Sequence, residues 1–501
     1  MPRIKPQQRT ILAWAFYDWA NSAFATVVIA GFFPLFYKQF WSTGVAATES
    51  TLWLGHANSL ASLLIVMLAP LLGAIADQLG RKKGFLLFFT ALGVIMTGSL
   101  YLVEMGSWVL ALTLYGLGIV GFSGSNIFYD ALLVNVTDRP HYDRVSSLGF
   151  ALGYLGGGLL FAFDVLMVLY PGYFGLSGQA AAMRLSFITA AVWWSVFSIP
   201  LMLLVHEPAV MRRKKNWVSA GFRQLLVTLR KVRQLRVTFL FLFAYWCYID
   251  GVDTIVRMAL AYGLDIGFDA NHLMVALLLT QFIGFPAALV FGHLGTQYGP
   301  KQGIMLAIII YLLILFGAYR MDSVWEFYLL AAAIGLVQGG IQALSRSLYA
   351  RLIPRDQAGE FFGFYNMLGK FAVVLGPVLM GWVGFLSDDS RLGILSISLL
   401  FVLGAILLAK VDVAAGQKQH VPWCIKLPEG LNPGTYRYPV TVRFGTGEKQ
   451  EIDFSGRRVT VRLCSGETQE DSICIDVLPR PAAPQVDAKV ALFDPRGETA
   501  R

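Results

Sequence analysis

Long uninterrupted apolar segments follow one another over most of the chain, separated by short polar stretches. About 20 apolar residues in α-helical form span the ~30 Å hydrocarbon core of a bilayer. Because the segments do not alternate with polar residues, they predict membrane helices rather than the strands of a barrel. Twelve spans are expected, at 12–36, 53–76, 85–103, 108–130, 147–169, 185–205, 237–261, 272–294, 303–319, 325–350, 361–385 and 392–409. The expected fold class is an all-α membrane protein with twelve transmembrane helices.

Charge strengthens this interpretation and predicts an orientation. Only 14% of the 501 residues are charged, against about 25% in soluble domains. Lys and Arg collect at the N-terminus and in alternate loops, whereas the intervening loops hold Lys38, Arg184, Arg320 and Arg391. Because basic loops stay on the cytoplasmic side, both termini are expected in the cytoplasm, with the protein in the cell (inner) membrane. The net charge of +9 is then a topology signal, and nucleic acid is not an expected partner.

A repeated motif divides the membrane region into two halves. The segment GAIADQLGRKKG (73–84) recurs as GHLGTQYGPKQG (292–303), with Thr296 where the first copy has an aspartate. Each copy follows the second of six predicted helices, as an internal duplication requires. The basic segment between the halves has apolar residues on one helical face, which predicts a helix lying on the inner leaflet. The expected parts are six-helix bundles at 1–205 and 237–410 and a cytoplasmic amphipathic linker at 206–236.

The C-terminal region has a different pattern. Its runs at 440–444, 451–454, 459–463 and 473–477 alternate apolar and polar residues and are separated by turn residues. This pattern predicts short antiparallel strands in a small sandwich or barrel. The expected parts are a β-rich cytoplasmic domain at 421–480, for which a cytoplasmic partner is one role, and a disordered tail at 481–501.

The first copy of the motif gathers charge at the cytoplasmic end of the second span. There Asp77 can pair with Arg81 or accept hydrogen bonds from the N-terminus of a neighbouring helix. Gly73 and Gly80 allow close helix approach and a tight turn. Such a cluster is costly in lipid and suits an interface between moving parts, although basic residues such as Lys83 also enforce topology. The expected gating residues are Gly73, Asp77, Gly80, Arg81 and Lys82.

Polar stripes at helical spacing recur on every third predicted span. They consist of Asp18, Asn21 and Ser22; Ser123, Asn126 and Asp130; Asp250, Asp253, Thr254 and Arg257; and Gln338, Gln342, Ser345 and Arg346. The third, sixth, ninth and twelfth spans carry no charge in their interiors and are expected to face lipid. Polar groups at membrane depth must be paired or hydrated. The four stripes are therefore expected to line a central, water-accessible path.

Several of these segments resemble a known family. The pattern G-x-x-x-D-x-x-G-R-K after a second helix is similar to the loop 2–3 motif of the major facilitator superfamily, with Gln78 replacing the usual basic residue. The resemblance to its vacuole-effluxer-like branch covers roughly 10–410. It is carried by YDWANSAFATVVIAGFFPLFY (17–37), GLVQGGIQALSRSLYARLIP (335–354) and GEFFGFYNMLGKFAVVLGP (359–377). That branch includes the autophagy-related vacuolar amino-acid exporter of fungi and bacterial permeases. The resemblance implies a major facilitator fold, alternating access, and efflux of amino acids or other small solutes.

Ionisable groups within the spans are the candidate transport residues. Asp18 and Asp253 are the candidate proton-coupling carboxylates. Alternatively, Asp18 accepts hydrogen bonds from a helix end, and Asp253 pairs with Arg257 one turn away. Arg346 and Lys370 would bind a carboxylate or phosphate or neutralise the acids, unless Arg346 snorkels to the inner surface. The candidate substrate-binding residues are Asn21, Asn126, Gln338, Gln342, Arg346 and Lys370.

Together these features favour a secondary active transporter that moves a small polar solute, with amino acids as one candidate, by proton-coupled alternating access. Two alternatives stay open: an exporter or flippase of an amphiphilic, lipid-like substrate, and a membrane sensor or scaffold that signals through the C-terminal β domain. The chain has no H-E-x-x-H, G-x-S-x-G or Walker motif, so an enzyme is not expected, nor is a cofactor or a metal. The expected partners are the solute, protons and the lipid bilayer, and a monomer is expected.

Overall fold

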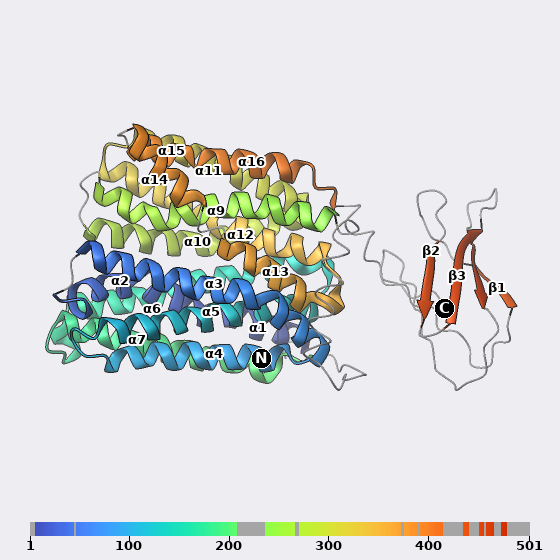
Figure 1. Cartoon of the computed structure of the whole chain (residues 1–501), viewed down its shortest axis with the longest axis horizontal. Coiled ribbons are helices and arrows are strands. Elements are labelled where there is room, and N and C mark those ends of the chain that lie inside the picture. The colour runs from blue at the N-terminus through green and yellow to red at the C-terminus, as the bar shows by residue number, and fades with distance from the viewer. Residues whose placement is uncertain are drawn as a thin grey trace, which may run out of the picture. The chain divides into compact units, whose positions relative to one another are not determined.

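The computed structural model in Figure 1 describes most of the membrane region and four strands of the C-terminal region. The described residues are 6–44, 47–207, 236–265, 270–371, 375–387, 390–413, 434–439, 450–454, 457–464 and 472–477. The chain divides into two compact units, 1–416 and 417–501. The first unit contains all of the described helices and the second contains the strands.

Twelve helical spans in the described residues are long and apolar enough to cross a membrane, which confirms the predicted number. The first six spans are formed by α1 (Pro6–Ala23) and its continuation, α3 (Ala47–Leu79), α4 (Lys82–Ser99), α5 (Trp108–Val136), α6 (Tyr142–Leu169) and α7 (Gln179–Leu204). The other six are formed by α9 (Arg236–Asp265), α10 (Ala270–Tyr298), α11 (Pro300–Arg320), α12 (Val324–Leu352), α13 (Ala358–Phe371) with α14 (Leu375–Ser387), and α15 (Ser390–Ser396) with α16 (Ser398–Ala409). Short 3₁₀ turns flank them at η3 (Leu100–Leu102), η4 (Arg139–His141), η5 (Pro171–Phe174) and η6 (Arg355–Gln357).

The first span is less regular than the sequence predicts. After α1 the chain continues as the π-helical segment η1 (Phe24–Phe32), the short α2 (Phe33–Phe36) and a second π-helical segment, η2 (Tyr37–Trp41). Such segments are rare and occur frequently at functional sites. Since η1 follows directly after the part of α1 that carries Asp18 and Asn21, the irregular backbone borders the first polar stripe.

The eleventh span is described in two segments, α13 and α14, on either side of residues 372–374. Asp250 on α9 accepts hydrogen bonds at the start of α14, from the backbone N–H groups of Leu375 (3.2 Å) and Gly376 (2.9 Å). Thr254, one turn further along α9, donates to the same carboxylate. Pro377 lies in the first turn of α14, where a missing N–H group is tolerated. Part of the third polar stripe therefore holds a helix end, rather than lining a path.

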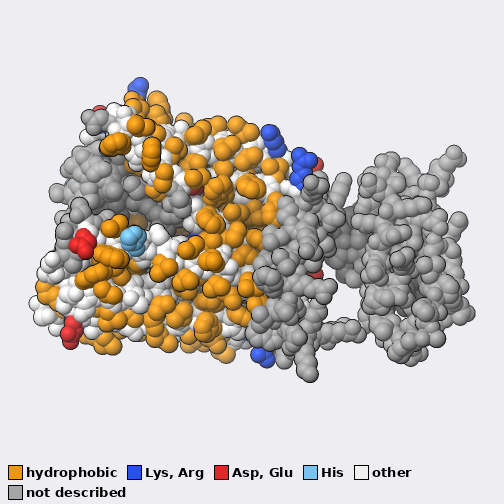
Figure 2. All heavy atoms as spheres, in the orientation of Figure 1, with side chains coloured by type: hydrophobic (Ala, Val, Ile, Leu, Met, Phe, Trp, Pro, Cys, Tyr) orange, Lys and Arg blue, Asp and Glu red, His pale blue; other side chains and the backbone are white. Residues whose placement is uncertain are grey.

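The third, sixth, ninth and twelfth spans present large apolar side chains at the surface, as predicted for lipid-facing helices. Examples are Ile95 on α4, Val196 on α7, Leu313 on α11 and Leu399 on α16. Figure 2 shows hydrophobic side chains over most of the described part of one face, with charged side chains mainly near its ends. Inside the bundle, the two halves of the chain meet where α3 packs against α13 and where α6 packs against α10 and α12.

The second unit contains one antiparallel sheet with the strand order β1-β4-β3-β2. Its strands are β1 (Gly434–Pro439), β2 (Gln450–Phe454), β3 (Arg457–Cys464) and β4 (Ser472–Val477). Three of them coincide with predicted strands, whereas the prediction at 440–444 lies outside the described residues. The described strands form an open sheet rather than a sandwich or barrel. A separately folded domain at 421–480 with a cytoplasmic partner stays a prediction; the helix at 206–236 and the tail at 481–501 lie almost wholly outside the described residues.

Candidate functional site

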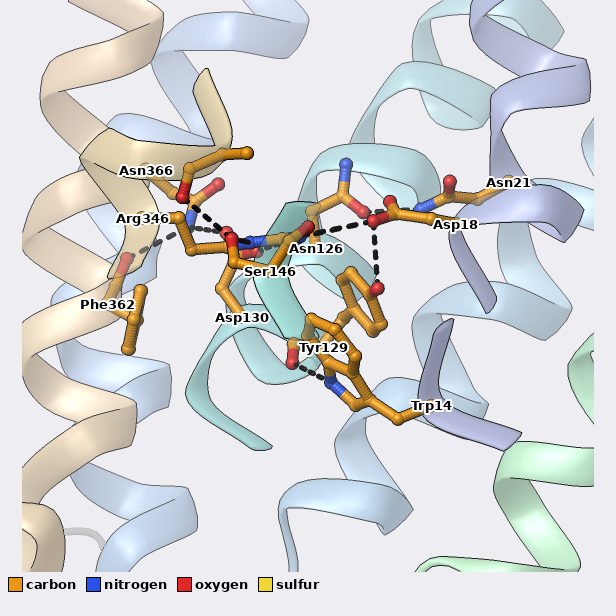
Figure 3. A network of polar contacts seen from close by, with 11 residues as sticks. Trp14, Asp18, Asn21, Asn126, Tyr129, Asp130, Ser146, Arg346, Phe362 and Asn366 are labelled. Atoms are coloured by element: carbon orange, nitrogen blue, oxygen red, sulfur yellow. Dashed lines mark hydrogen bonds and ion pairs between the residues drawn. The ribbon is translucent and has the colours of Figure 1, made fainter. Parts of the chain in front are cut away.

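A buried guanidinium group, that of Arg346 on α12, lies at the centre of a polar cluster between the two halves of the chain (Figure 3). All five of its N–H groups can be assigned to acceptors on the first half. Nε donates to the hydroxyl of Ser146 (2.9 Å) and Nη2 to the carbonyl oxygen of the same residue (2.8 Å). Nη1 donates to Oδ1 of Asp130 (3.1 Å), and both Nη atoms lie 3.3 Å from Oδ2 of Asp18. The side chain of Arg346 is only 3% exposed, so the alternative that it snorkels to the surface is wrong.

The two carboxylates of this cluster have different surroundings. Oδ2 of Asp18 accepts a third hydrogen bond, from the hydroxyl of Tyr129 at 2.8 Å. Asp130 uses both oxygens, since its Oδ2 accepts from the side-chain amide of Asn366 on α13 (3.1 Å). Two carboxylates thus share one guanidinium, and the cluster joins α1, α5 and α6 to α12 and α13.

Aromatic rings enclose the guanidinium group. Its Cζ atom lies 4.9 Å from the ring centroid of Trp14, 5.3 Å from that of Tyr129 and 4.3 Å from that of Phe150. The indole N–H of Trp14 donates to the carbonyl oxygen of Tyr129 at 3.0 Å, which fixes these two residues relative to each other. Arg tolerates such surroundings better than Lys because its charge is delocalised, planar and weakly hydrated.

Amide side chains lie next to the ion cluster, on the side toward the middle of the membrane-spanning helices. Asn21 on α1 donates to Asn126 on α5 at 2.6 Å, and each is about one turn from a carboxylate of the cluster. Gln342 and Gln338 are half-buried on α12, one and two turns before Arg346. The structure therefore brings together Asp18, Asn21, Asn126 and Arg346, as the polar stripes predict.

The other two predicted site residues lie away from Arg346. Lys370 on α13 is half-buried, with its Nζ atom 6.0 Å from the ring centroid of Phe122 on α5. Asp253 on α9 is also half-buried and is not among the groups that bond to Arg346. Its predicted pairing with Arg257 lies outside the described residues, because the side chain of Arg257 is not described.

Sequence reasoning missed four polar members of the cluster, one of which is Tyr129. Asp130 belongs to the predicted stripe on the fourth span, but its pairing with Arg346 was not predicted. Ser146 and Asn366 were not singled out at all. A usable signal existed for Asn366, which lies one helical turn before Lys370 on the same face.

The repeated motif forms a second contact between the halves, at the end of the bundle where α3 ends and α4 begins, hereafter the motif end. The carboxylate of Asp77 accepts hydrogen bonds from the backbone N–H groups of Gly359 (3.0 Å) and Glu360 (2.8 Å), at the start of α13. The predicted contact with a helix N-terminus is thus confirmed. The other contact considered for Asp77, an ion pair with Arg81, is not made: Arg81 is exposed at the start of α4, and Lys82 makes the pair instead, at 3.1 Å.

Two glycines of the motif are required by the backbone. A Cβ atom on Gly73 would lie 2.0 Å from the carbonyl oxygen of Gly359, so α3 and α13 could not approach as closely. Gly80 has φ +60°, a left-handed conformation that favours glycine, and it turns the chain from α3 into α4. The glycines thus set the shape of the contact and Asp77 supplies its charge.

Further ionic contacts close the motif end. The buried Asp143 on α6 accepts hydrogen bonds from Ser347 and from Arg351 (2.6 Å) on α12. Arg355, which follows α12, pairs with Asp138 near the start of α6 at 3.3 Å. Each of these pairs joins the first half of the chain to the second. In the described residues, charged contacts between the halves gather at this one end.

The neighbouring Lys83 also makes specific contacts, beyond the topological role predicted for it. Its Nζ atom donates to the carbonyl oxygen of Val205 (2.5 Å), at the end of α7, and its backbone N–H donates to Glu207. Burial raises the pKa of the Glu207 carboxyl above its ordinary value, and the nearby lysines oppose this shift. These contacts lie within the first half and fasten α4 to α7.

Solved structures with a similar helical arrangement show which fold the chain has. The transporter FucP of the major facilitator superfamily (MFS), in the outward conformation, aligns with TM-score 0.59 and 16% identity over 81% of this chain and 98% of that one. The human organic anion transporter MFSD10 aligns with TM-score 0.61 and 15% identity over 81% of this chain and 100% of that one. With its twelve apolar helices, the chain has the fold of these major facilitator transporters.

Sequence comparison then gives the family. Residues 6–141 and 134–421 match the family described as "Vacuole effluxer Atg22 like", and the chain belongs to it. The "Uncharacterized MFS-type transporter YxiO" of Bacillus subtilis (strain 168) is 40% identical over 413 residues, 82% of this chain and 96% of that protein. Autophagy-related protein 22 of Yarrowia lipolytica is 26% identical over 321 residues, 58% of this chain and 54% of that protein. These relatives confirm the predicted family and make the chain a secondary transporter rather than an enzyme.

Proposed function

We propose that the protein exports a small polar solute by proton-coupled alternating access, and that the state described above is the one closed at the motif end. One observation carries the proposal: the buried cluster in which Arg346 of the second half holds Asp18 and Asp130 of the first half. Alternating access requires contacts between the halves that form in one state and are released in the other. Ionic contacts meet this requirement, because water can replace each partner once the end opens. The basic residues beside the motif support a cytoplasmic position for this end.

Within this proposal, the coupled proton binds to Asp18. Two carboxylates and one guanidinium leave an excess negative charge, and a buried uncompensated charge is costly. Both oxygens of Asp130 accept N–H donors, so Asp130 is held in its ionised form. Oδ2 of Asp18 accepts its donors from Tyr129 and Arg346, and among the described residues no donor bonds to Oδ1. Oδ1 of Asp18 is therefore the atom of the cluster that can hold a proton, which favours Asp18 over Asp253.

The solute would bind on the side of the ion cluster that faces away from the motif end. The hydrogen-bonded pair of Asn21 and Asn126 lies on that side, as do Gln338 and Gln342 on α12. Amide groups both donate and accept hydrogen bonds, which suits an uncharged or zwitterionic polar solute. Arg346, once released from the acids, and Lys370 would supply positive charge for a carboxylate. Amino acids fit this chemistry, and the family description of a vacuole effluxer supports the direction of transport.

The test is the isosteric variant Asp18→Asn in proteoliposomes that contain the purified full-length protein. Asn keeps an acceptor for Tyr129 but binds no proton, so uptake of labelled amino acids driven by a pH gradient should stop, whereas exchange without a gradient should continue. The matched control, Asp253→Asn, should keep its response to the gradient. Unchanged proton coupling in Asp18→Asn would contradict the assignment. If neither the natural protein nor the variants move amino acids, comparing metabolites and lipids in deletion and overexpressing cells would identify an amphiphilic substrate instead.

A further inference from the structure

An apolar groove runs along the lipid-facing side of the first half, between α4 and α7. It encloses about 440 Å³, within the range of roughly 300–1,000 Å³ found for ligand pockets. Its walls include Val94, Ile95 and Gly98 from α4 and Ile188, Ala191 and Val192 from α7. A Cβ atom on Gly98 would lie 3.5 Å from the Cβ atom of Ala191, an ordinary contact distance. Because Gly98 lines the groove, a large side chain at this position would project into it.

The length of the groove fits one leaflet of a bilayer. Its lining extends from Val94 to Leu102 along α4 and η3, and from Ile188 to Val196 along α7. At about 1.5 Å per helical residue, each wall is ~12 Å long, less than half of the ~30 Å hydrocarbon core. The α4 wall lies in the half of its span farther from the motif end, and the α7 wall lies at the middle of α7. A straight apolar chain of one lipid tail matches a groove of this shape.

A cationic group lies where the groove reaches the membrane interface. Arg184, in the second turn of α7, precedes Ile188 by four residues and so shares its helical face. Its Nε atom donates to the carbonyl oxygen of Tyr101 at 3.0 Å, and Nη2 donates to the same oxygen. Its Cζ atom lies 5.2 Å from the ring centroid of Tyr101, which lines the groove, and 6.0 Å from that of Phe40. Two of five N–H groups are thus used, and no other acceptor bonds to this guanidinium within the described residues.

We propose that this groove binds a phospholipid of the bilayer, with one acyl chain along the groove and the phosphate on Arg184. A free phosphate ion is excluded as the main ligand, since it would leave most of the apolar groove unfilled. Arg is suited to phosphate because its planar N–H groups can bond two oxygens together. The aromatic rings on either side of Arg184 are typical of the level of lipid headgroups. This site is independent of the transport path, because α4 and α7 contribute no residue to the Arg346 cluster.

The experiment is native mass spectrometry of the full-length protein, titrated in detergent with dioleoylphosphatidylglycerol. The unmodified protein should retain one lipid, and Arg184→Gln should retain it at least tenfold more weakly. Gly98→Leu, which fills the groove and leaves the contacts of Arg184 unchanged, should weaken binding to a similar extent. Dioleoylglycerol, which has the same acyl chains without a phosphate, should bind to the unmodified protein as weakly as phosphatidylglycerol binds to Arg184→Gln.

The matched control is Arg320→Gln, at the same end of the bundle. The guanidinium of Arg320 also lies over an aromatic ring, that of Phe316 at 5.3 Å, but neither residue lines the groove. This variant should bind lipid like the unmodified protein. If Arg184→Gln and Gly98→Leu retain the lipid as strongly as the unmodified protein does, the proposal is overturned, as it would be by equal binding of the two lipids to the unmodified protein. If Arg184→Gln fails to fold, the results with Gly98→Leu and dioleoylglycerol still decide the question.

Discussion

The two copies of the repeated motif have the same glycine turn and differ in the contacts of their polar side chains. In the first copy, Asp77 reaches across to the other half of the chain and caps the start of α13. In the second copy, Thr296 is exposed and donates to the carbonyl oxygen of Gly292, in its own helix. Lys301 of the second copy donates to the carbonyl oxygens of Ala409 and Val411, also within its own half. One copy ties the halves together by charge, and the other stabilises its own half.

The shape of the contact is nevertheless kept in both copies. Gly80 and Gly299 have φ +60° and +93°, so both loops turn through a conformation that favours glycine. A Cβ atom on Gly73 would meet the backbone of α13 at 2.0 Å, and one on Gly292 would meet the Cβ atom of Ser147 on α6 at 2.6 Å. Both copies therefore bring helices of opposite halves into close contact. Helix packing at the motif end is therefore similar in the two copies, whereas the ionic contact between the halves is made, among the described residues, by the first copy alone.

The largest difference between the copies is expected for Asp77→Ala against Thr296→Ala. Removing one partner of a buried ionic contact costs about 3 kcal/mol, which favours the open motif end about a hundredfold. Thr296→Ala removes only a local bond at an exposed position and should change the balance by less than about 0.5 kcal/mol. The measurement is the rate at which a water-soluble maleimide labels Ala343→Cys, buried behind the cluster, in a chain whose native cysteines are replaced by serine. Equal labelling rates in the two variants would show that the charge of Asp77 does not hold the end closed.

A smaller and more symmetric effect is expected for Gly73→Ala and Gly292→Ala. Each adds a methyl group where the opposite half leaves no room, and overpacking typically costs about 1–3 kcal/mol. Both variants should increase maleimide labelling at position 343, Gly73→Ala more strongly because its clash is with a backbone oxygen. Gly98→Ala, where a Cβ atom makes an ordinary contact, is the control and should leave labelling unchanged. Faster labelling in Gly73→Ala alone would mean that packing is as one-sided as charge.

The smallest effect is expected for the lysines of the two copies. Lys82→Gln weakens the pair with Asp77 but leaves the two backbone donors in place. The state closed at the motif end should therefore lose about 1 kcal/mol of stability relative to the open state, and the rate of solute exchange should change a few-fold. Lys301→Gln loses contacts within one half and should lower the melting temperature without altering exchange. Both quantities can be measured on the same purified samples. A change of exchange in Lys301→Gln would indicate that the second loop also takes part in gating.

The sequence was sufficient for the spans because continuous apolar runs have few alternatives in a membrane. It did not predict the contact of Asp250, on a distant helix, with the backbone N–H groups of Leu375 and Gly376 in the eleventh span. For Asp77 it offered Arg81 or a helix N-terminus as partners, and it did not name Lys82 as the ion-pair partner. The start of α4 at Lys82 decides that contact, and helix boundaries are the least certain part of a pattern.

The polar stripes predicted which faces of the helices point inward, and hence the grouping of Asp18, Asn21, Asn126 and Arg346. They did not predict the acceptors of Arg346, because periodicity gives the rotation of one helix but not its depth relative to its neighbours. Asp130 and Ser146 accept from Arg346, and Asn366 donates to Asp130; because the three come from different helices, they meet only when all are packed. A cluster of this kind becomes visible in the tertiary structure alone.

The eleventh span is fastened at two places that belong to different halves of the transporter. Its first segment, α13, begins on a carboxylate from α3, and its second segment, α14, begins on a carboxylate from α9. If the halves part at the motif end, as proposed above, the eleventh span cannot stay attached to both aspartates while it moves as one rigid unit. Either α13 lets go of Asp77, or it swings away from α14 and travels with the opposite half.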